Sequence, residues 1–287
     1  MTTHPADLDL AVIERIVERD TDAALVAMIR ERVAALLLVG PSPSEPTDAR
    51  GRVLTTFVDQ FVIDVSGIDD SLRGHMFEHL GADAMGFAQA LYVIDLGIRR
   101  RIVIDRLGPI APLEVVDVDV PAHLMLWPAI ENYLRSVARM KALDPVTAEL
   151  VRLRGAAAHQ CRICKSRLSV QAVEALGSAE PFESIVASRP TDLAPRHTAA
   201  VQFVDVVVTL PTGLDETMAA TLHSFFSTEE LHEMLHDVVR NSANKFAVAV
   251  GGDEAVVSEG IEFYDLDAEG DVIADIDADI VRAATRV

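Results

Sequence analysis

The order of apolar and polar residues along this chain predicts a protein built mainly from helices. The apolar side chains of Leu10, Ile13 and Ile16 keep the three-to-four-residue spacing that places side chains on one face of a helix. Comparable periodicity covers most of residues 8–106 and 123–250. Alanine, valine and leucine supply most of the apolar residues, and aromatic residues make up only 5% of the chain. The pattern therefore predicts an all-α fold.

Two stretches depart from the helical periodicity. Residues 107–121 are punctuated by proline, which predicts an extended linker. Near the end of the chain, residues 261–265 and 271–275 flank a turn-like segment at residues 268–270. Short segments on either side of such a turn are typical of a β-hairpin. We therefore expect a short hairpin after the helices.

Part of the sequence repeats. The tripeptide Phe-Val-Asp at residues 57–59 recurs at residues 203–205, an offset of 146. Upstream, the Leu-Val pair at residues 25–26 aligns with residues 150–151 at an offset of 125. A second copy with additional residues between these two blocks indicates a tandem duplication of one helical unit.

The repeat and the linker together predict how the chain is organised. At the offset of 125, Leu36 and Val39 stand where the second copy has its two cysteines. The first copy is thus a degenerate repeat without thiols. The predicted regions are a first helical repeat at 1–106, a linker at 107–121, a helical domain with both cysteines at 122–252, and an acidic tail with the hairpin at 253–287.

Charge and apolar runs narrow the expected partners and compartment. The chain has 25 Lys and Arg against 45 Asp and Glu, a formal net charge of −20. Nucleic acids and anionic membranes should repel it, so neither is an expected partner. The longest apolar run, residues 33–39, is far shorter than the roughly 18 residues of a membrane span. An acidic N-terminus is unlike a signal peptide, so we expect a cytoplasmic, reducing compartment.

The two cysteines of the chain, Cys161 and Cys164, are three residues apart. Random placement would give that spacing in under about 1% of cases, so the Cys-x-x-Cys motif indicates a function. Two thiols cannot form a four-cysteine zinc site, and no histidine pair follows at zinc-finger spacing. A redox-active dithiol is favoured. The alternative is that two small apolar residues share a buried helix face.

Basic residues surround this motif in the sequence. No acidic residue occurs between Leu150 and Val173, although the whole chain is acidic. Cationic neighbours favour a thiolate, so the sequence predicts a lowered pKa for the Cys164 thiol. A solvated basic helix face is the alternative interpretation. The cations in this window are Arg152, Arg154, Arg162, Lys165 and Arg167.

The motif and its surroundings resemble a known superfamily. Glu149 precedes the Cys-x-x-Cys motif by eleven intervening residues, and a Leu-Asp-Pro turn at residues 143–145 follows a predicted helix. This combination resembles the alkyl hydroperoxidase D (AhpD)-like and carboxymuconolactone decarboxylase superfamily. The resemblance covers residues 121–252 well and the first copy weakly. It implies two all-helical AhpD-like units, no cofactor, and a homo-oligomer, with a trimer favoured and a dimer next.

The resemblance also implies a reaction and the residues that carry it. The chain would be an AhpD-like alkylhydroperoxidase, an antioxidant oxidoreductase that reduces a hydroperoxide and is re-reduced by a dithiol donor protein. By this resemblance Cys164 is the peroxidatic cysteine, Cys161 is the resolving cysteine, and Glu149 is the proton-relay carboxylate. The family has a relay histidine four residues after the second cysteine, but this chain has Leu168 there. We therefore expect weak peroxidase activity.

Two nearby residues and two other functions complete the sequence-based hypotheses. His159 and Arg167 lie near the motif and are auxiliary candidates, although neither matches a family position. A rival hypothesis is a cofactor-free lyase or isomerase, similar to the lactone decarboxylases, acting on a small organic acid or lactone. In that case Glu149 or His159 would move protons, and the thiols would be incidental. The third hypothesis is a non-catalytic helical assembly.

Two histidine pairs resemble zinc-protease motifs. His232 and His236 belong to a His-Glu-x-x-His string, and His75 and His79 belong to a His-x-x-Glu-His string. Histidines four residues apart share one face of a helix, as zinc binding requires, but each pair needs a further ligand. Because apolar residues lie between His232 and His236, the sequence favours packing or surface roles and predicts no metal site.

Overall fold

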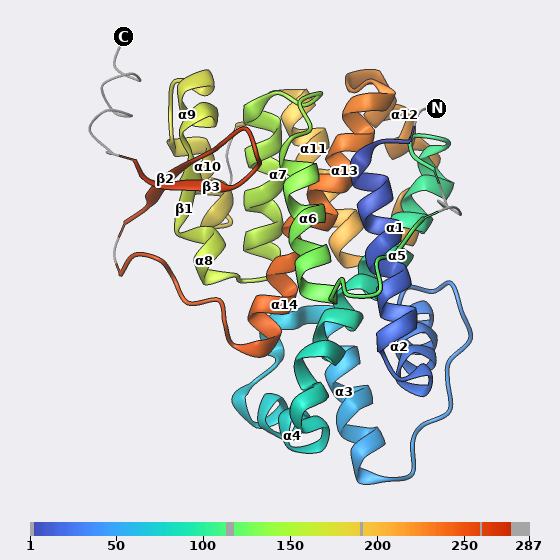
Figure 1. Ribbon diagram of the computed structural model, residues 1–287. Coiled ribbons are helices and arrows are strands. Elements are labelled where there is room, and N and C mark those ends of the chain that lie inside the picture. Colours follow the sequence, from blue (N-terminus) through green and yellow to red (C-terminus); the bar gives the residue numbers. More distant parts are fainter. Residues whose placement is uncertain (1–2, 113–117, 190–191, 259, 277–287) are drawn as a thin grey trace.

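The computed structural model describes residues 3–112, 118–189, 192–258 and 260–276, and these residues form a mainly helical molecule (Figure 1). The predicted all-α fold with a short terminal hairpin is confirmed. The helices of the first half are α1 (Pro5–Asp20), α2 (Ala23–Leu36), α3 (Ala49–Asp64), α4 (Asp70–Leu80) and α5 (Ala84–Leu107), with 3-10 turns at Val65–Gly67 and Gly81–Asp83.

The second half contains more and shorter helices. Among the described residues, none of the helices has the length and apolarity needed to cross a membrane. The helices are α6 (Leu126–Ala138), α7 (Pro145–Ala158), α8 (Arg162–Lys165), α9 (Val170–Leu176), α10 (Glu180–Val186), α11 (Pro195–Thr209), α12 (Glu216–Phe225), α13 (Thr228–Asn241) and α14 (Ala243–Val250), with a 3-10 turn at Pro211–Gly213.

The structure shows which residues of α2 and α7 correspond, and this correspondence differs from the one that the sequence predicted. Both helices begin at an aspartate N-cap, and left-handed residues follow their C-caps: Leu38 (φ 61°) and Gln160 (φ 54°), 122 positions apart. The following residue, Val39 or Cys161, donates its backbone N–H to the carbonyl five residues earlier. The offset of 125 is therefore wrong for these helices. In the first copy Val39 corresponds to Cys161, and Ser42 stands 122 positions before Cys164.

Downstream, the offset of 146 describes the second block of the repeat. The turns at 65–67 and 211–213 lie 146 residues apart, as do the N-cap residues Asp69 and Asp215 of α4 and α12. One further residue separates the last helices, because the burial pattern of α5 recurs in α13 at an offset of 147. The corresponding buried residues are Ala84, Phe87, Ala88 and Leu91 in α5, and Leu231, Met234, Leu235 and Val238 in α13.

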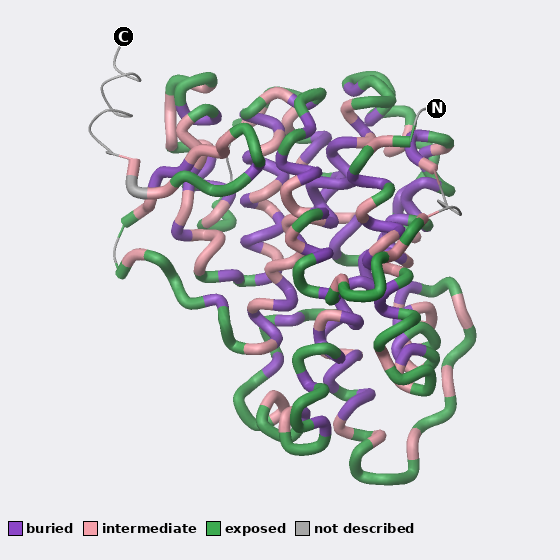
Figure 2. Tube along the Cα trace, in the orientation of Figure 1, coloured by how far each residue is buried: buried purple, intermediate pink, exposed green. Residues whose placement is uncertain are grey.

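The two halves share their hydrophobic cores. Helix α1 packs against α6, and α2 packs against α3 as α7 packs against α11. One cluster of buried residues joins α1–α5 to α6 and α14, and another joins the end of α5 to α11–α13. The buried segments accordingly run through the middle of the molecule (Figure 2). The domain boundaries stay a prediction. Residues 113–117 of the predicted linker and 277–287 of the tail lie outside the described residues.

A small sheet lies beside the helices. Strands β2 (Glu262–Leu266) and β3 (Val272–Ile276) pair antiparallel, which confirms the hairpin. A third strand, β1 (Arg167–Ser169), pairs parallel with β2 and places Leu168 opposite Phe263. The sequence did not predict β1. It forms because α8 ends after one turn, and the chain then runs extended along the hairpin.

Candidate functional site

The two thiols lie next to each other at the end of α7. The left-handed turn at Gln160 redirects the chain after α7, so Cys161 becomes the N-cap residue of the short helix α8. The two Sγ atoms are 2.7 Å apart, and the Cys164 thiol donates to Asn244 Oδ1 at 2.9 Å. The Cys161 side chain is completely buried, whereas Cys164 is partly exposed. The structure thus brings together the cysteine pair that the sequence predicted.

Acidic residues from distant parts of the chain neutralise the basic residues around the thiols. Arg162 pairs with Asp253 at 2.9 Å, and Arg167 pairs with Glu262 at 2.5 Å. Both acids belong to the segment after α14. The sequence between 150 and 173 has no acidic residue, but in the folded protein acidic residues from elsewhere lie beside its arginines. Arg167, an auxiliary candidate, holds the hairpin rather than a thiol.

The predicted lowering of the Cys164 pKa is wrong. The hydrogen bond with Cys161 and burial both raise the pKa of the Cys164 thiol. The pKa of Cys161 is lowered by its hydrogen bond with the Cys164 side chain and by the Cys164 backbone N–H. Cys161 is thus the thiol of the pair that loses its proton first, and Cys164 is the one that solvent reaches.

Glu149, the predicted proton relay, lies in α7 and is occupied by other groups. Its carboxylate forms a two-point ion pair with Arg152, with both distances 2.7 Å. It also accepts hydrogen bonds from the Tyr264 hydroxyl and the Ser169 backbone N–H, both at 3.0 Å. Arg152 in turn donates to the carbonyl of Cys164 at 2.9 Å. Glu149 therefore supports the cysteine turn through Arg152 and makes no hydrogen bond to a thiol.

The family position of the relay histidine does not face the thiols. Leu168 lies in β1 and is packed in a hydrophobic cluster with Phe263, so an imidazole at this position would be buried there. The residue that contacts Cys164 is Asn244, from α14. Sequence analysis missed Asn244, because 80 residues separate it from Cys164 and no motif marks it.

His159 lies beside a buried group of charged residues. It is the C-cap residue of α7, is buried, and has no hydrogen-bond partner at Nε2 among the described residues. Burial, together with the nearby cations Lys245 and Arg99, keeps the pKa of His159 well below its usual value. Those two cations share the buried carboxylate of Asp95, at 2.5 Å and 2.8 Å respectively. His159 therefore borders a buried charge cluster, and the structure does not bring it to the thiols.

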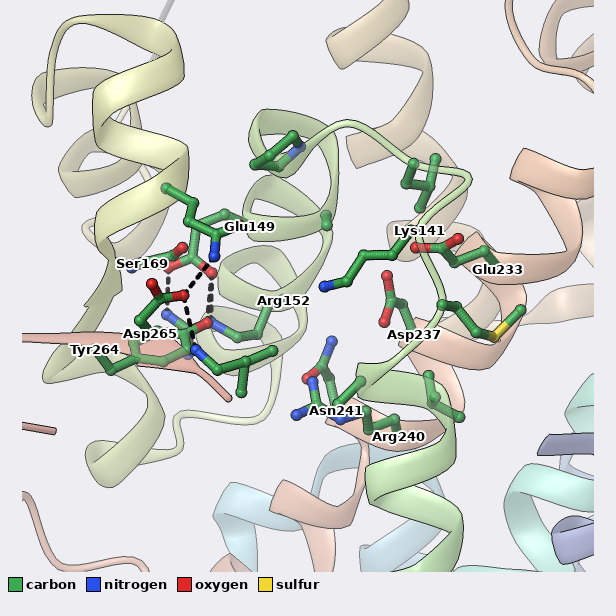
Figure 3. Close-up of a pocket in the computed structure, with 18 residues that line it drawn as sticks. Lys141, Glu149, Arg152, Ser169, Glu233, Asp237, Arg240, Asn241, Tyr264 and Asp265 are labelled. Atoms are coloured by element: carbon green, nitrogen blue, oxygen red, sulfur yellow. Dashed lines mark hydrogen bonds and ion pairs between the residues drawn. The ribbon is translucent and has the colours of Figure 1, made fainter. Parts of the chain in front are cut away.

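A polar pocket of about 110 Å³ is lined in part by Glu149 and Arg152 (Figure 3). Across the pocket from this pair, α13 contributes Asp237 and Arg240. Burial raises the pKa of Asp237 to about 7. A carboxyl group that titrates near neutral pH beside two arginines is a candidate proton donor or acceptor for a small anion.

Comparison with known proteins identifies relatives of the whole chain. The uncharacterized protein Rv2313c of Mycobacterium tuberculosis strain H37Rv is 34% identical over 269 residues, which cover 88% of this chain and 92% of that protein. The uncharacterized protein MT2376 of strain CDC 1551 matches to the same extent. The chain belongs to the family of these proteins. No family model and no solved structure matches it.

In this member of the Rv2313c family, the predicted site residues fall into three places. Cys161 and Cys164 form the thiol pair, Glu149 is tied into the polar pocket, and His159 lies in the buried charge cluster. Arg167 belongs to the sheet, where it pairs with a residue of the hairpin. The thiol pair and the polar pocket are therefore two separate candidate sites.

Proposed function

We propose that Cys161 and Cys164 form a dithiol–disulfide centre that reduces a hydroperoxide. The observation that carries this proposal is the 2.7 Å contact between the two sulfur atoms. Sulfur atoms this close can form a disulfide with only small side-chain rotations, since both residues belong to one tight turn. A cytoplasmic, reducing setting, which the sequence favours, would return such a pair to the dithiol form.

The proposed reaction divides the two roles between the cysteines. The Cys161 thiolate takes the proton of the Cys164 thiol while the Cys164 sulfur attacks the terminal oxygen of the hydroperoxide. The O–O bond breaks, Cys164 becomes a sulfenic acid, and the alkoxide takes the proton back from Cys161 to leave as an alcohol. In this scheme Cys161 performs the proton transfer that a relay histidine performs in the family that the sequence resembles.

Disulfide formation completes the oxidation. The Cys161 thiolate attacks the Cys164 sulfur, the S–O bond breaks, and the released hydroxide takes a proton from solvent to become water. The two sulfurs together lose two electrons, and the peroxide gains them. A dithiol donor protein then reduces the disulfide by thiol–disulfide exchange. The partial exposure of Cys164 supports this residue as the one that meets peroxide and donor.

Mass spectrometry of the reduced protein after one equivalent of an alkyl hydroperoxide tests the proposal. We expect the wild type to lose two hydrogens as an intramolecular disulfide. We expect Cys161→Ser, which lacks the proton acceptor, to react more slowly and to stop at a sulfenic acid on Cys164 that dimedone traps, and Cys164→Ser to remain unmodified. A wild-type protein whose two thiols are both unchanged under these conditions would contradict the redox function.

The polar pocket supports a second candidate function, cofactor-free proton transfer on a small organic acid or lactone. The specific observation is Asp237, whose pKa is raised to about 7 by burial and which shares the pocket with Arg152 and Arg240. Arg240 would bind the carboxylate of the substrate while Asp237 moves a proton. Thermal shifts with small acids and lactones test this function, and Asp237→Asn should abolish turnover of any ligand found.

The two functions can be separated from each other and from a purely structural role. A double Cys161→Ser/Cys164→Ser variant should lose peroxide reduction and keep ligand binding in the pocket. Asp237→Asn should keep peroxide reduction and abolish turnover of the pocket ligand. A protein that shows neither thiol oxidation nor binding of small acids would be a non-catalytic helical assembly.

A further inference from the structure

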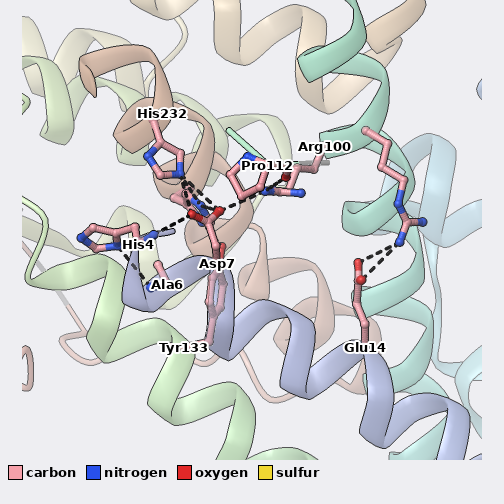
Figure 4. A network of polar contacts seen from close by, with 10 residues as sticks. His4, Ala6, Asp7, Glu14, Arg100, Pro112, Tyr133 and His232 are labelled. Carbon is pink, nitrogen blue, oxygen red and sulfur yellow. Dashed lines mark hydrogen bonds and ion pairs between the residues drawn. The ribbon is translucent and has the colours of Figure 1, made fainter. Parts of the chain in front are cut away.

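Two histidines of α13 and one aspartate of α1 converge at the N-terminal end of the molecule (Figure 4). His232 and His236 are one helical turn apart, and their Nε2 atoms are 3.1 Å from each other. Oδ1 of Asp7 lies 3.0 Å from Nε2 of His236 and 3.3 Å from Nε2 of His232. Since 225 residues separate Asp7 from His232, no sequence motif shows this cluster.

We propose that Asp7, His232 and His236 bind one divalent transition-metal ion of the zinc class. Two imidazole nitrogens and a carboxylate oxygen are a donor set that zinc uses in three-ligand sites. In a tetrahedral complex with bonds of about 2.0–2.1 Å, the ligand atoms are about 3.3 Å apart. The three separations at this site, 3.0, 3.1 and 3.3 Å, nearly match one face of such a tetrahedron.

The surrounding residues hold the three ligands in place. The Tyr133 hydroxyl of α6 lies 3.0 Å from Nδ1 of His236, so it can accept the N–H of an imidazole whose Nε2 binds a metal. The His4 backbone N–H donates to Oδ2 of Asp7 at 3.2 Å, within the capping box that begins α1. Asp7 and His236 are almost completely buried, and His232 is partly exposed.

The fourth coordination position of the proposed metal would be open to solvent on the side of His232, the partly exposed ligand. A cavity of about 520 Å³ borders this residue and is also lined by His4 and Glu233. Glu233, the glutamate of the His-Glu-x-x-His string, accepts a hydrogen bond from the Ala142 backbone N–H and so stabilises the loop before α7. Glu233 is therefore not placed as the glutamate of a zinc protease would be. The proposed metal site fastens α1 to α13.

One contact provides the competing explanation. Arg100 donates to Oδ1 of Asp7 at 3.0 Å and to the Pro112 carbonyl at 2.7 Å. Without an ion, Arg100 would balance the aspartate charge, and the histidines would complete a hydrogen-bonded network. With an ion, Oδ1 of Asp7 can bind the metal and still accept the hydrogen bond from Arg100, because each carboxylate oxygen has two lone pairs. The two explanations differ in whether the protein retains a metal.

The experiment uses the full chain without a polyhistidine tag and with both cysteines changed to serine, so that no thiol can bind metal. After incubation with Zn²⁺ and gel filtration, elemental analysis should find one zinc per chain. Zinc should also raise the thermal midpoint. His232→Gln and His236→Gln should each weaken zinc binding at least tenfold. His232→Gln is the safer of the two for folding, because this side chain is 14% exposed.

The chain contains a matched control. His75 and His79 in α4 have the same four-residue spacing and are both exposed. The double variant His75→Gln/His79→Gln should keep one zinc per chain with unchanged affinity. A parent protein that retains less than about 0.1 zinc per chain would overturn the proposal in favour of the hydrogen-bonded network. Loss of zinc in the His75/His79 variant would also overturn it, since the ion would then sit at the surface pair.

Discussion

The two copies of the helical unit have the same framework but different chemistry. Their helices start at corresponding caps, turn at corresponding left-handed residues and bury corresponding faces. Apart from Asp7 of α1, the polar and thiol groups discussed at the candidate sites lie in the second copy. Cys161, Glu149, His232, His236 and Asp237 of the second copy correspond to Val39, Ala27, Met85, Gln89 and Ala90 of the first.

Corresponding positions of the two copies also differ in how far their side chains are buried. Val39 is 49% exposed, whereas Cys161 at the corresponding position is completely buried. The difference arises because the segment after α14 covers the second copy, where Asp253 binds both the side chain and the backbone of Arg162. The duplication thus provides two equivalent turns, and the residues inserted after α8 and appended after α14 enclose one of them.

The largest effect is expected where the two copies are joined. Asp95 of α5 pairs with Arg99 and with Lys245 of α14, and all three side chains are buried. Asp95→Ala leaves two buried cations without a carboxylate to balance their charge, so we expect a loss of about 3–5 kcal/mol in the free energy of unfolding. Urea denaturation measures it. Glu18→Ala, which removes an exposed pair with Arg30, should cost at most about 1 kcal/mol. Equal losses in both variants would show that the buried cluster does not hold the copies together.

The second effect concerns Asp237, which corresponds to Ala90 in the first copy. Since burial raises its pKa to about 7, the folded state binds a proton more tightly than the unfolded chain does. Its contribution to stability is complete below about pH 4 and is lost as the pH rises through 7. Asp237→Asn cannot titrate and should therefore gain about 1–3 kcal/mol relative to the wild type between pH 4 and pH 8.

Thermal unfolding of wild type and Asp237→Asn at both pH values provides this comparison. Asp70→Asn, at a fully exposed side chain, is the control and should change stability little at either pH. A constant difference between wild type and Asp237→Asn across the pH range would mean that this carboxyl group does not titrate near neutral pH in the folded protein.

The third effect concerns Asn244, the residue of α14 that contacts the Cys164 thiol. Asn244 accepts the hydrogen bond of the Cys164 thiol, and an aspartate there would place a negative charge beside the sulfur. The charge should raise the pKa of Cys164 further, so alkylation by iodoacetamide in the Cys161→Ser background should slow about tenfold at pH 7.5. Asn241→Asp, in the polar pocket, is the matched control. Unchanged rates in Asn244→Asp would remove Asn244 from the thiol site.

The smallest effect on the fold is expected at the exposed turn of the first copy. Leu38 is 70% exposed and Val39 is 49% exposed, so Leu38→Ser/Val39→Ser should change the free energy of unfolding by about 0.5 kcal/mol or less.

The family resemblance predicts a trimer of chains, with a dimer next. Light scattering at micromolar concentration should therefore give a multiple of 31.1 kDa. A strict monomer would contradict the predicted assembly.

Local chemistry in the sequence determined much of the fold. The spacing of apolar residues predicted most of the helices, and the turn at residues 268–270 predicted the hairpin, because both features depend on neighbours within one or two turns. The boundary between α1 and α2 also has a local cause, because the Asp22 side chain caps α2. The duplication was also visible, although its first block was aligned three residues out of register.

The sequence also determined that Cys161 and Cys164 lie together, because only two residues of one turn separate them. Only the tertiary structure decided their surroundings. Asp253 and Glu262 neutralise the nearby arginines, and Asn244 reaches Cys164, because segments about 80–95 residues away fold over the turn. Coulombic and hydrogen-bond terms depend on distances in space, so a window of sequence without acids could not predict the order of the two thiol pKa values.

The same distinction applies to the histidine pair of α13. Helical periodicity placed His232 and His236 on one face, which the sequence alone could establish. Whether that face meets core, solvent or a third ligand depends on how α1 packs, and the packing of α1 against α6 brings Asp7 to the two imidazoles. A metal ligand set assembled from the first and the thirteenth helix has no local signature, since only the folded core fixes the distance between them.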